Sequence, residues 1–438
     1  MAKLANIIDI GHILDAWLPG KILYDRIPGL SVGIVHKGKL VYAQGFGYAD
    51  VAAKTPMTPE TNVRIASISK TFTAIAILQL ADAGKLKLND KVQKHLDWVR
   101  GDVAKLTIRQ ILLHTGGILR DGDTEHWSDD EFPDDQGLRE SFLRTNPLRA
   151  YRGTFKYSNF GFALLGQIIA HVSGMPYETY VSKHILTKLG MEKTRPDFAH
   201  GASEHLARGY SRDIPKEERT IFTPVPVRAY APAAGFISSV NDLAKYVAAL
   251  AKGTVLLSTK SKKEALRPIK KTGPSHGKYG LGFEIDDIQG HTVFGHGGSF
   301  LGFRTKIRVD AANDIAVITL TNATNTAASD INKAIVELLY GLPAIKPKRS
   351  KKTARFATAY GGWYRSLWSD LCVVPADTCL FAFAPRLTLK PTDITVLTPH
   401  DDDTFEIHTT DGFSNAGELT IFKENGLKWG TMPYKRLA

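Results

Sequence analysis

The sequence predicts an α/β (α+β) fold: an antiparallel sheet flanked by helices, with a helical region inserted into it and a small all-β domain following it. Three observations support this prediction. Strand patterns lie near residue 30 and again between 281 and 321, mainly helical patterns fill 105–260, and short strand-like runs broken by Gly, Pro and Asp continue to the C-terminus. We therefore expect one sheet built from segments that are far apart in the chain.

The composition is typical of a globular protein. Hydrophobic residues make up 43% of the 438 residues and charged residues 23%, which excludes disordered, collagen-like and low-complexity classes. Two cysteines are too few for a disulfide scaffold or a cysteine-rich metal site. The formal charge of +12 raises the question of nucleic acid. A chain of this length can spread such a charge over a solvated surface, so we expect no nucleic-acid partner.

The first twenty residues are expected to form an amphipathic helix. Apolar residues from Leu4 to Trp17 recur mostly at helical spacing. Asp9, His12 and Asp15 interrupt this run where a signal peptide needs an uncharged core, and no stretch has the length of an uncharged membrane span. We therefore expect a cytoplasmic protein without a membrane partner, with a trimmed periplasmic precursor as the alternative.

Local patterns predict the individual elements. Residues 30–35 and 40–45 are apolar and β-branched on either side of His36-Lys-Gly-Lys39, which indicates a hairpin. A helix rich in Ala, Ile and Leu is expected over 67–83, ended by Gly84. Further elements are expected as helices at 160–172, 239–250 and 327–340 and as strands at 281–287, 291–295, 301–309 and 314–321.

A basic linker is expected to separate two domains. Residues 343–353 contain two prolines and a cluster of positive charge, which is typical of a linker. The main domain is then 1–342, and a small β-barrel-like domain is 354–438. In the small domain Cys372 and Cys379 are close enough to lie on facing strands of a hairpin, and in a cytosol we expect two reduced thiols.

The first candidate for chemistry is Ser67-Ile-Ser-Lys70, at the start of an expected helix. Residues three apart share one face of a helix, so Ser67 and Lys70 are expected to be neighbours. A serine hydroxyl becomes a nucleophile when a base takes its proton, and a lysine desolvated by burial can be that base in its neutral form. The alternative is that Ser67 only caps the helix.

The second candidate is Tyr157-Ser-Asn159, just before an apolar helix. Tyr157 is the only one of the fifteen tyrosines that lies in a Tyr-x-Asn sequence. A phenol beside an amine can relay a proton, and an amide can orient Lys70 or a substrate carbonyl. The alternative is a structural tyrosine, with Asn159 as the helix N-cap.

The third candidate is His296-Gly-Gly298-Ser299, expected to follow a strand. Glycines let a substrate approach the backbone closely, and a strand edge at this point can donate an N–H to an oxyanion. The alternative is a glycine turn between two strands.

Together, in this order and these contexts, the three motifs resemble the serine β-lactamase and penicillin-binding-protein-like family, in particular its class C β-lactamase, esterase and D-aminopeptidase branch. The resemblance covers about residues 20–340 and is specific for the family but not for a substrate. It includes four further phrases: Pro28-Gly-Leu-Ser-Val-Gly33, Leu112-Leu-His-Thr-Gly-Gly117, Tyr279-Gly-Leu-Gly-Phe283 and Ala316-Val-Ile-Thr-Leu-Thr-Asn322.

The resemblance implies a role for each matching residue. Ser67 matches the acylated nucleophile, and Lys70 and Tyr157 match the paired general base and proton relay. The implied mechanism is acylation of Ser67 followed by attack of water, with no metal and no cofactor. The residues that match substrate-binding and oxyanion positions are Asn159, His296, Gly297, Gly298 and Ser299, the last through its backbone N–H together with that of Ser67.

One departure from the family pattern bears on the substrate. The third motif of the family commonly reads Lys-Thr-Gly, whereas this chain has His296-Gly-Gly. A literal Lys271-Thr-Gly273 is followed by Pro274 instead of a strand and is set aside. Without the lysine, a fixed cation for a substrate carboxylate is missing, so strong penicillinase or carboxypeptidase activity is not expected. A histidine here is similar to the D-aminopeptidase and related peptidase or esterase members.

The expected function is therefore a serine hydrolase that cleaves small esters, amides or peptides, and a homo-oligomer is left open. The alternative from another class is an acylatable penicillin-binding sensor or a non-catalytic scaffold on the same fold. The acidic stretch from Asp121 to Glu131, with Asp134 and Asp135, is either a solvated loop or a lid that attracts a cationic end of the substrate.

Overall fold

The computed structural model describes residues 7–198, 206–267, 270–271, 277–342, 357–376, 379–384, 389–409 and 415–437. The chain divides into two compact units, Pro28–Asn332 and the combination of Met1–Ile27 with Lys333–Ala438. Each unit has a hydrophobic core of its own. The predicted linker 343–353 lies outside the described residues, so the domain boundary stays a prediction.

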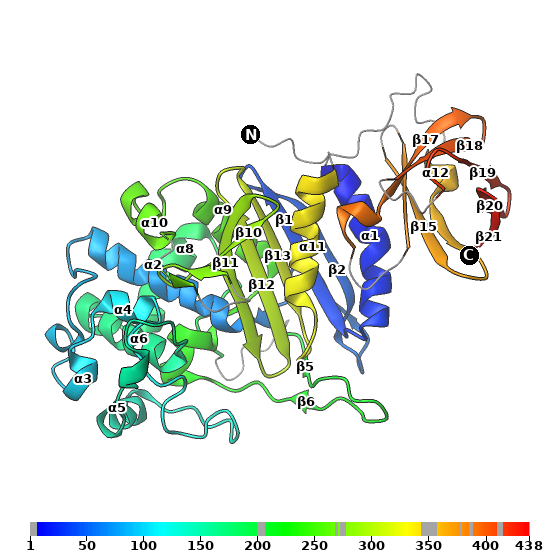
Figure 1. Ribbon diagram of the computed structural model, residues 1–438. Coiled ribbons are helices and arrows are strands. Elements are labelled where there is room, and N and C mark those ends of the chain that lie inside the picture. Colours follow the sequence, from blue (N-terminus) through cyan, green and yellow to red (C-terminus); the bar gives the residue numbers. More distant parts are fainter. Residues whose placement is uncertain are drawn as a thin grey trace. The chain divides into compact units, whose positions relative to one another are not determined.

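The larger unit is built on an antiparallel sheet (Figure 1), whose described strands follow the order β3-β2-β1-β13-β12-β11-β10-β9-β8. Two distant segments meet in its middle, where Leu30 of β1 pairs with Thr321 of β13. This confirms the predicted sheet of N- and C-terminal segments. The described strands are β1 Gly29–His36, β2 Lys39–Asp50, β3 Thr55–Pro56, β8 Lys270–Lys271, β9 Lys278–Tyr279, β10 Glu284–Ile288, β11 His291–Phe300, β12 Phe303–Asp310 and β13 Ile315–Thr321.

The inserted region is helical, as predicted, and its helices lie beside the sheet within this unit (Figure 1). A short ladder of β4 Val63–Arg64 with β7 Ile237–Ser238 joins it to the preceding segment, and a second, of β5 Gly209–Tyr210 with β6 Ile221–Phe222, lies within it. The described helices of this unit are α2 Ser69–Asp82, α3 Gly101–Ala104, α4 Ile108–Leu112, α5 Asp135–Arg144, α6 Asn159–Ser173, α7 Tyr177–Val181, α8 Thr187–Leu189, α9 Val240–Ala251, α10 Thr259–Ala265 and the start of α11 Ala328–Gly341.

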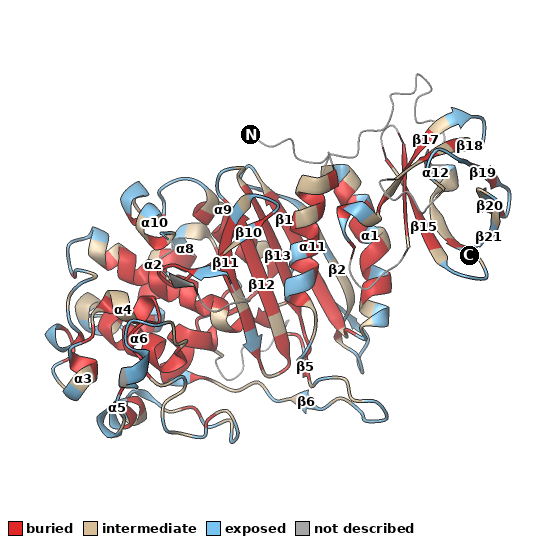
Figure 2. Cartoon of the chain, in the orientation of Figure 1, coloured by how far each residue is buried: buried red, intermediate tan, exposed pale blue. Residues whose placement is uncertain are grey.

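The helix α2 is buried on nearly all sides, which Figure 2 shows as a red ribbon within the helical region. Its sequence, SKTFTAIAILQLAD, is apolar around most of its circumference, which is typical of an interior helix. The Phe72 ring stacks on Tyr246 of α9 at 3.9 Å and on Phe236 at 4.5 Å between ring centroids. This packing fixes the helix that begins directly after the candidate nucleophile.

The smaller unit contains α1 Ile7–Tyr24, α12 Ala357–Tyr360 and a barrel whose described strands close in chain order from β14 to β21. This confirms the predicted C-terminal all-β domain. Cys372 pairs in register with Phe383, and Cys379 precedes β16, so the two thiols are not opposite each other on the hairpin. The strands are β14 Gly362–Arg365, β15 Asp370–Pro375, β16 Leu380–Phe383, β17 Thr395–Asp401, β18 Thr404–His408, β19 Leu419–Lys423, β20 Gly426–Trp429 and β21 Met432–Arg436.

Three local predictions differ from the structure. The helix expected over 67–83 begins as a 3₁₀ turn, Ala66–Ile68, and becomes α-helical at Ser69. The strand expected over 281–287 begins only at Glu284, because Gly282 has a φ of +80° and turns the chain. The strand expected over 291–295 continues to Phe300, so His296–Ser299 is part of β11 and not a turn.

Among the described helices, none combines the length and apolarity needed to cross a membrane.

Candidate active site

Ser67 lies on the 3₁₀ turn between β4 and α2, and its neighbours hold this turn tightly. Ile65 donates its N–H to the Phe236 carbonyl at 2.8 Å. The Ser69 hydroxyl donates to the Ala66 carbonyl at 2.5 Å and accepts the Phe236 N–H at 3.0 Å. Ala66 has a φ of +50°, in the left-handed region that a non-glycine residue seldom adopts. These bonds stabilise a strained backbone that presents Ser67 to the pocket.

The nucleophile turn packs directly on β11 at Gly298. A Cβ atom at this position would lie 2.2 Å from the Ile65 carbonyl oxygen and 2.1 Å from Thr305 Oγ1. Thr305 donates its hydroxyl to the same Ile65 carbonyl at 3.0 Å. Only glycine therefore allows this approach of the two backbones. Gly297 is different, because the nearest atom to a Cβ there lies 3.6 Å away.

The Lys70 side chain is completely buried beneath Ser67. Its Nζ lies 2.7 Å from Asn159 Oδ1, 2.8 Å from the Ala233 carbonyl oxygen and 3.3 Å from Ser67 Oγ. Burial lowers the pKa of Lys70 well below its ordinary value, against a smaller opposing effect of Asp121. A neutral amine has two N–H donors and one lone pair. The two shorter contacts are to oxygens that only accept, so the lone pair is left for the Ser67 hydroxyl.

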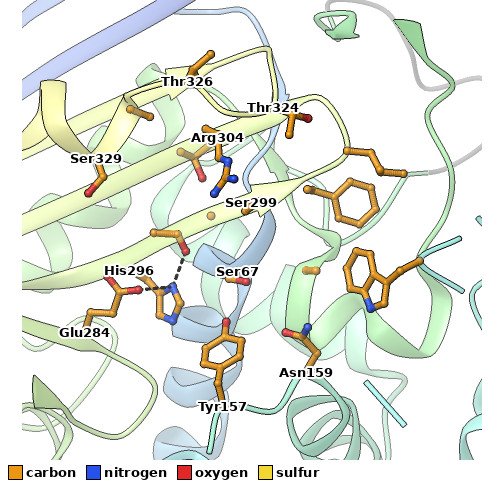
Figure 3. Close-up of a pocket in the computed structure, with 18 of the residues that line it drawn as sticks. Ser67, Tyr157, Asn159, Glu284, His296, Ser299, Arg304, Thr324, Thr326 and Ser329 are labelled. Atoms are coloured by element: carbon orange, nitrogen blue, oxygen red, sulfur yellow. Dashed lines mark hydrogen bonds and ion pairs between the residues drawn. The ribbon is translucent and has the colours of Figure 1, made fainter. Parts of the chain in front are cut away.

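Tyr157 also lies beside Ser67, with its hydroxyl directed toward the serine (Figure 3). Its ring packs against Lys70, whose Nζ is 4.8 Å from the ring centroid. Burial raises the pKa of Tyr157 far above its ordinary value, and the hydrogen bond with Ser67 offsets only part of this effect. The phenol therefore keeps its proton in the resting site, and of the two groups beside Ser67 the amine is the better base.

Asn159 is the first residue of α6, but it is not the helix cap. Ser158 is the N-cap, because its hydroxyl accepts the Gly161 N–H at 2.8 Å. Asn159 instead donates its amide to Asp121 Oδ1 at 2.6 Å. A carboxylate can only accept here, so this bond turns the amide oxygen of Asn159 toward Lys70. The capping alternative for Asn159 is therefore wrong.

His296 is buried in a hydrogen-bonded network at the edge of the pocket. Its Nδ1 lies 2.6 Å from the Gly297 carbonyl oxygen and 3.5 Å from Glu284 Oε1, and its Nε2 lies 2.9 Å from the Tyr279 hydroxyl. Both neighbours of Nδ1 are acceptors, so this nitrogen carries the proton and Nε2 accepts from Tyr279. Burial lowers the pKa of His296 to about 4, with Glu284 opposing the shift. The imidazole is therefore neutral at physiological pH.

The predicted site residues gather around one pocket of about 570 Å³. Ser67, Tyr157 and Asn159 line it together with His296 to Ser299 of β11. Figure 3 shows Ser67, Tyr157, Asn159, His296 and Ser299 around this space. Lys70 is the exception, because it lies beneath the pocket wall. Both residues that supply the expected oxyanion N–H groups, Ser67 and Ser299, border this space.

Several pocket residues were not predicted from the sequence. Glu284 follows the phrase Tyr279-Gly-Leu-Gly-Phe283 directly, so its position beside a motif was the one available signal. Glu284 also contacts Lys306 of β12 in a close ion pair, and His296 and Lys306 together lower the pKa of Glu284 to about 2, against the opposing effect of partial burial. Arg304 lines the pocket as well, and no local pattern distinguishes it from other charged residues, whereas Asp121, which also lines the pocket, belongs to the acidic stretch that the sequence singled out.

The acidic stretch does not form a uniformly charged lid. Asp123 accepts from Ser141 and Arg144, and Asp134 caps α5 by accepting the Gly137 N–H at 2.9 Å. These carboxylates have structural partners, and Asp121 is the acidic residue of the stretch that lines the pocket. Among the described residues, no group of three or more His, Cys, Asp or Glu side chains could hold a metal ion.

Sequence comparison gives relatives in one family. The Beta-lactamase family profile matches residues 21–342. Protein flp of Staphylococcus aureus (strain MW2) is 31% identical over 258 residues, which is 56% of this chain and 49% of that protein. This chain thus spans about half the length of the staphylococcal relatives it matches. Penicillin-binding protein 4* of Bacillus subtilis (strain 168) is 28% identical over 343 residues, 74% of this chain and 75% of that protein.

Solved structures show the same fold. The octameric penicillin-binding protein homologue from Pyrococcus abyssi has a TM-score of 0.65 at 25% identity and covers 96% of this chain and 99% of its own. The D-stereospecific amidohydrolase from Streptomyces sp. has a TM-score of 0.63 at 24% identity and covers 76% of this chain and 98% of its own. The family profile extends over well over half of the sequence and includes all three motifs, and we conclude that this chain belongs to the Beta-lactamase family.

Proposed function

We propose that this chain is a serine hydrolase that cleaves small esters or amides, including peptides, through an acyl-enzyme on Ser67. The observation that carries the proposal is the buried Lys70 amine, 3.3 Å from Ser67 Oγ, with its other two close contacts made to acceptors. Such an amine is neutral at the pH where an exposed lysine is charged, and it is placed to take the serine proton.

Acylation begins when Ser67 Oγ attacks the substrate carbonyl carbon. As the Oγ–C bond forms, the hydroxyl proton passes to Lys70 Nζ and the carbonyl π electrons move onto the oxygen. The N–H groups of Ser67 and Ser299 are proposed to stabilise this oxyanion. When the carbonyl re-forms, the bond to the leaving oxygen or nitrogen breaks, and Tyr157 is placed to donate the proton that the leaving group needs and to regain one from Lys70.

Deacylation returns the enzyme to its starting state. A water molecule loses a proton to the Lys70–Tyr157 pair while its oxygen attacks the acyl carbon. Ser67 Oγ then leaves and takes that proton back. The sum is one ester or amide plus one water giving one acid plus one alcohol or amine, and all proton transfers are made by residues of this chain.

Within this class, an esterase or D-aminopeptidase-like activity is the proposal we favour. A neutral His296 occupies the place where the family commonly has a lysine, so that position supplies no fixed cation. The D-stereospecific amidohydrolase has a similar fold, which agrees with amide substrates for this chain. The alternative, an acylatable sensor, requires the same first step and differs only in the second.

Turnover distinguishes a hydrolase from an acylatable sensor. A fluorophosphonate probe is expected to label Ser67 in wild-type protein and not in Ser67→Ala, with the site located by mass spectrometry. With p-nitrophenyl acetate, a hydrolase releases many equivalents of p-nitrophenol, whereas a sensor releases one. Absence of both labelling and release from a folded wild-type protein would rule out the proposal, and thermal melts of both proteins establish folding.

A further inference from the structure

Three cations stand on one face of β12. Arg304, Lys306 and Arg308 are at alternate positions of the strand, so their side chains project to the same side of the sheet. The residues opposite them on β11 include Gly297, which pairs with Lys306, and Ser299, which pairs with Arg304. Position 297 carries no bulky side chain, so Lys306 can pass over β11 and reach β10; even a Cβ at this position would lie 3.6 Å from Lys306 Cδ, which is an ordinary contact.

Two of the three cations are neutralised by carboxylates of β10. Lys306 contacts Glu284 in a close ion pair, and Arg308 lies 3.5 Å from Asp286. In both pairs the partners are 22 positions apart in the sequence. The same offset from Arg304 leads to Gly282, which has no side chain. In the part of the chain that the structure describes, pairs of cation and carboxylate are therefore formed at Lys306 and Arg308 but not at Arg304, the one of the three that lines the Ser67 pocket.

Of these three cations, Arg304 is the one that has no carboxylate partner among the described residues. Its Nε is buried and has no hydrogen-bond partner among the described residues, and its side chain lines the pocket that contains Ser67. Figure 3 shows Arg304 above Ser299, on the side of the pocket away from Asn159. A buried guanidinium nitrogen without a partner loses free energy that an anionic ligand would restore.

Hydroxyl groups line the pocket on either side of Arg304 (Figure 3). The Thr324 hydroxyl oxygen accepts the Gly302 N–H at 3.0 Å, and the Ser329 hydroxyl oxygen accepts from Arg308 at 3.4 Å. Both residues line the pocket, and since their oxygens already accept, their O–H groups are available to donate. Arg120 also lines the pocket, but it lies 3.2 Å from Asp121 in an ion pair, so this cation already has the carboxylate that Arg304 lacks among the described residues.

We propose that Arg304 binds a carboxylate of the substrate while Ser67 attacks the scissile carbonyl. A planar carboxylate matches the guanidinium fork, and it takes the place that Glu284 and Asp286 have beside the other two cations. This inference rests on the proposed function and names its substrate class: esters or amides with one carboxylate. It also places the anion-binding cation on β12, whereas the sequence pattern offered only the third motif, where the lysine is missing.

Matched esters test the proposal. Mono-p-nitrophenyl glutarate carries its carboxylate on the acyl side, 4-acetoxybenzoate carries it on the leaving group, and p-nitrophenyl butyrate and phenyl acetate are the neutral counterparts. For wild-type protein, kcat/KM is expected to favour the anionic member of at least one pair. In Arg304→Gln that preference is expected to fall about 10- to 100-fold, the range for one charged hydrogen bond. Arg304→Lys should retain part of it.

Arg139→Gln is the control, because it removes the same charge from an exposed residue outside the pocket and should leave the preference unchanged. Two results would overturn the subsite while leaving the proposed hydrolase intact, provided that neutral esters are still hydrolysed. In the first, wild-type protein shows no preference for anionic esters; in the second, wild type and Arg304→Gln show the same preference. If no ester is hydrolysed, the proposed function fails, and calorimetry of benzoate binding to Ser67→Ala decides the subsite. If Ser67→Ala binds benzoate and the double variant Ser67→Ala/Arg304→Gln does not, the subsite is supported. If both bind benzoate equally, or Ser67→Ala does not bind it, the subsite is overturned.

Discussion

Replacing Gly298 by alanine tests whether the nucleophile is held by direct backbone contact with β11. The new Cβ would lie 2.2 Å from the Ile65 carbonyl oxygen, and that oxygen belongs to a backbone held by its own hydrogen bonds. Thr305 Oγ1, at 2.1 Å, could rotate away only by giving up its 3.0 Å bond to the same carbonyl. An ordinary non-bonded contact needs well over 3 Å, so the strand and the turn must separate by about 1 Å.

The magnitude follows from these contacts. Overpacking of this kind costs about 1–3 kcal/mol, and the lost Thr305 bond adds about 1 kcal/mol, so we expect Gly298→Ala to reduce the free energy of unfolding by about 2–4 kcal/mol. A shift of about 1 Å at Ser67 should lower the acylation rate about 100-fold. Urea unfolding and single-turnover release of p-nitrophenol measure the two effects separately.

Gly297→Ala is the matched control. It adds the same methyl group one residue away, where the nearest atom is 3.6 Å distant, so stability and acylation should remain close to wild type. Equal behaviour of the two variants, whether both harmless or both damaging, would refute the reasoning. It would show that the close approach at Gly298 does not position Ser67.

The remaining predictions concern the protons of the site. Lys70→Ala should slow acylation by 100-fold or more, whereas Tyr157→Phe should slow amides more than activated p-nitrophenyl esters, because a good leaving group needs no proton; stopped-flow acylation with both substrates checks this. Because burial lowers the pKa of Lys70, kcat/KM of the wild type should rise with pH to a plateau that is reached well below pH 10.5. Because the pKa of Tyr157 is raised, kcat/KM should not fall again below pH 10. An inflection near pH 10.5 would contradict the assignment of Lys70 as the base. Stability should fall as pH drops from 6.5 toward about 4, because the unfolded chain binds the His296 proton more tightly than the folded protein, and further from 4.5 toward about 2 as Glu284 is protonated. Urea unfolding at pH 7 and pH 4.5 should show a smaller loss in His296→Gln than in wild type.

The fold was predictable because its patterns are local and long. Some elements have an apolar pattern that lies within one continuous segment of the sequence: the hairpin of β1 and β2, the helix α6 and the strand β13. The end of β11 was not, because the glycines of His296-Gly-Gly298 suggest a turn when they are considered without their neighbours. In the fold Gly298 has to be a glycine because the Ile65 backbone approaches it closely, whereas at Gly297 a methyl group would make only ordinary contacts.

The nucleophile, base and relay could be identified from motifs, but the groups that set their protonation could not. Asp121 orients Asn159, and Glu284 faces His296, through contacts between segments more than ten residues apart. Arg304 is distinguished from Lys306 and Arg308 by the carboxylate on another strand that it lacks among the described residues. Register between distant strands decides such partners, and no spacing within one segment encodes it.

The protonation state of Lys70 is the most direct test of this chemistry. NMR titration of protein labelled with ¹³C at lysine Cε, with the Lys70 signal assigned by its absence in Lys70→Gln, gives the pKa of this amine in the resting enzyme. A pKa well below 10.5, so that the amine is largely uncharged where the enzyme works, is the expected result. A Lys70 signal that titrates with the exposed lysines would show a permanently charged ammonium beside Ser67, which could not serve as the base.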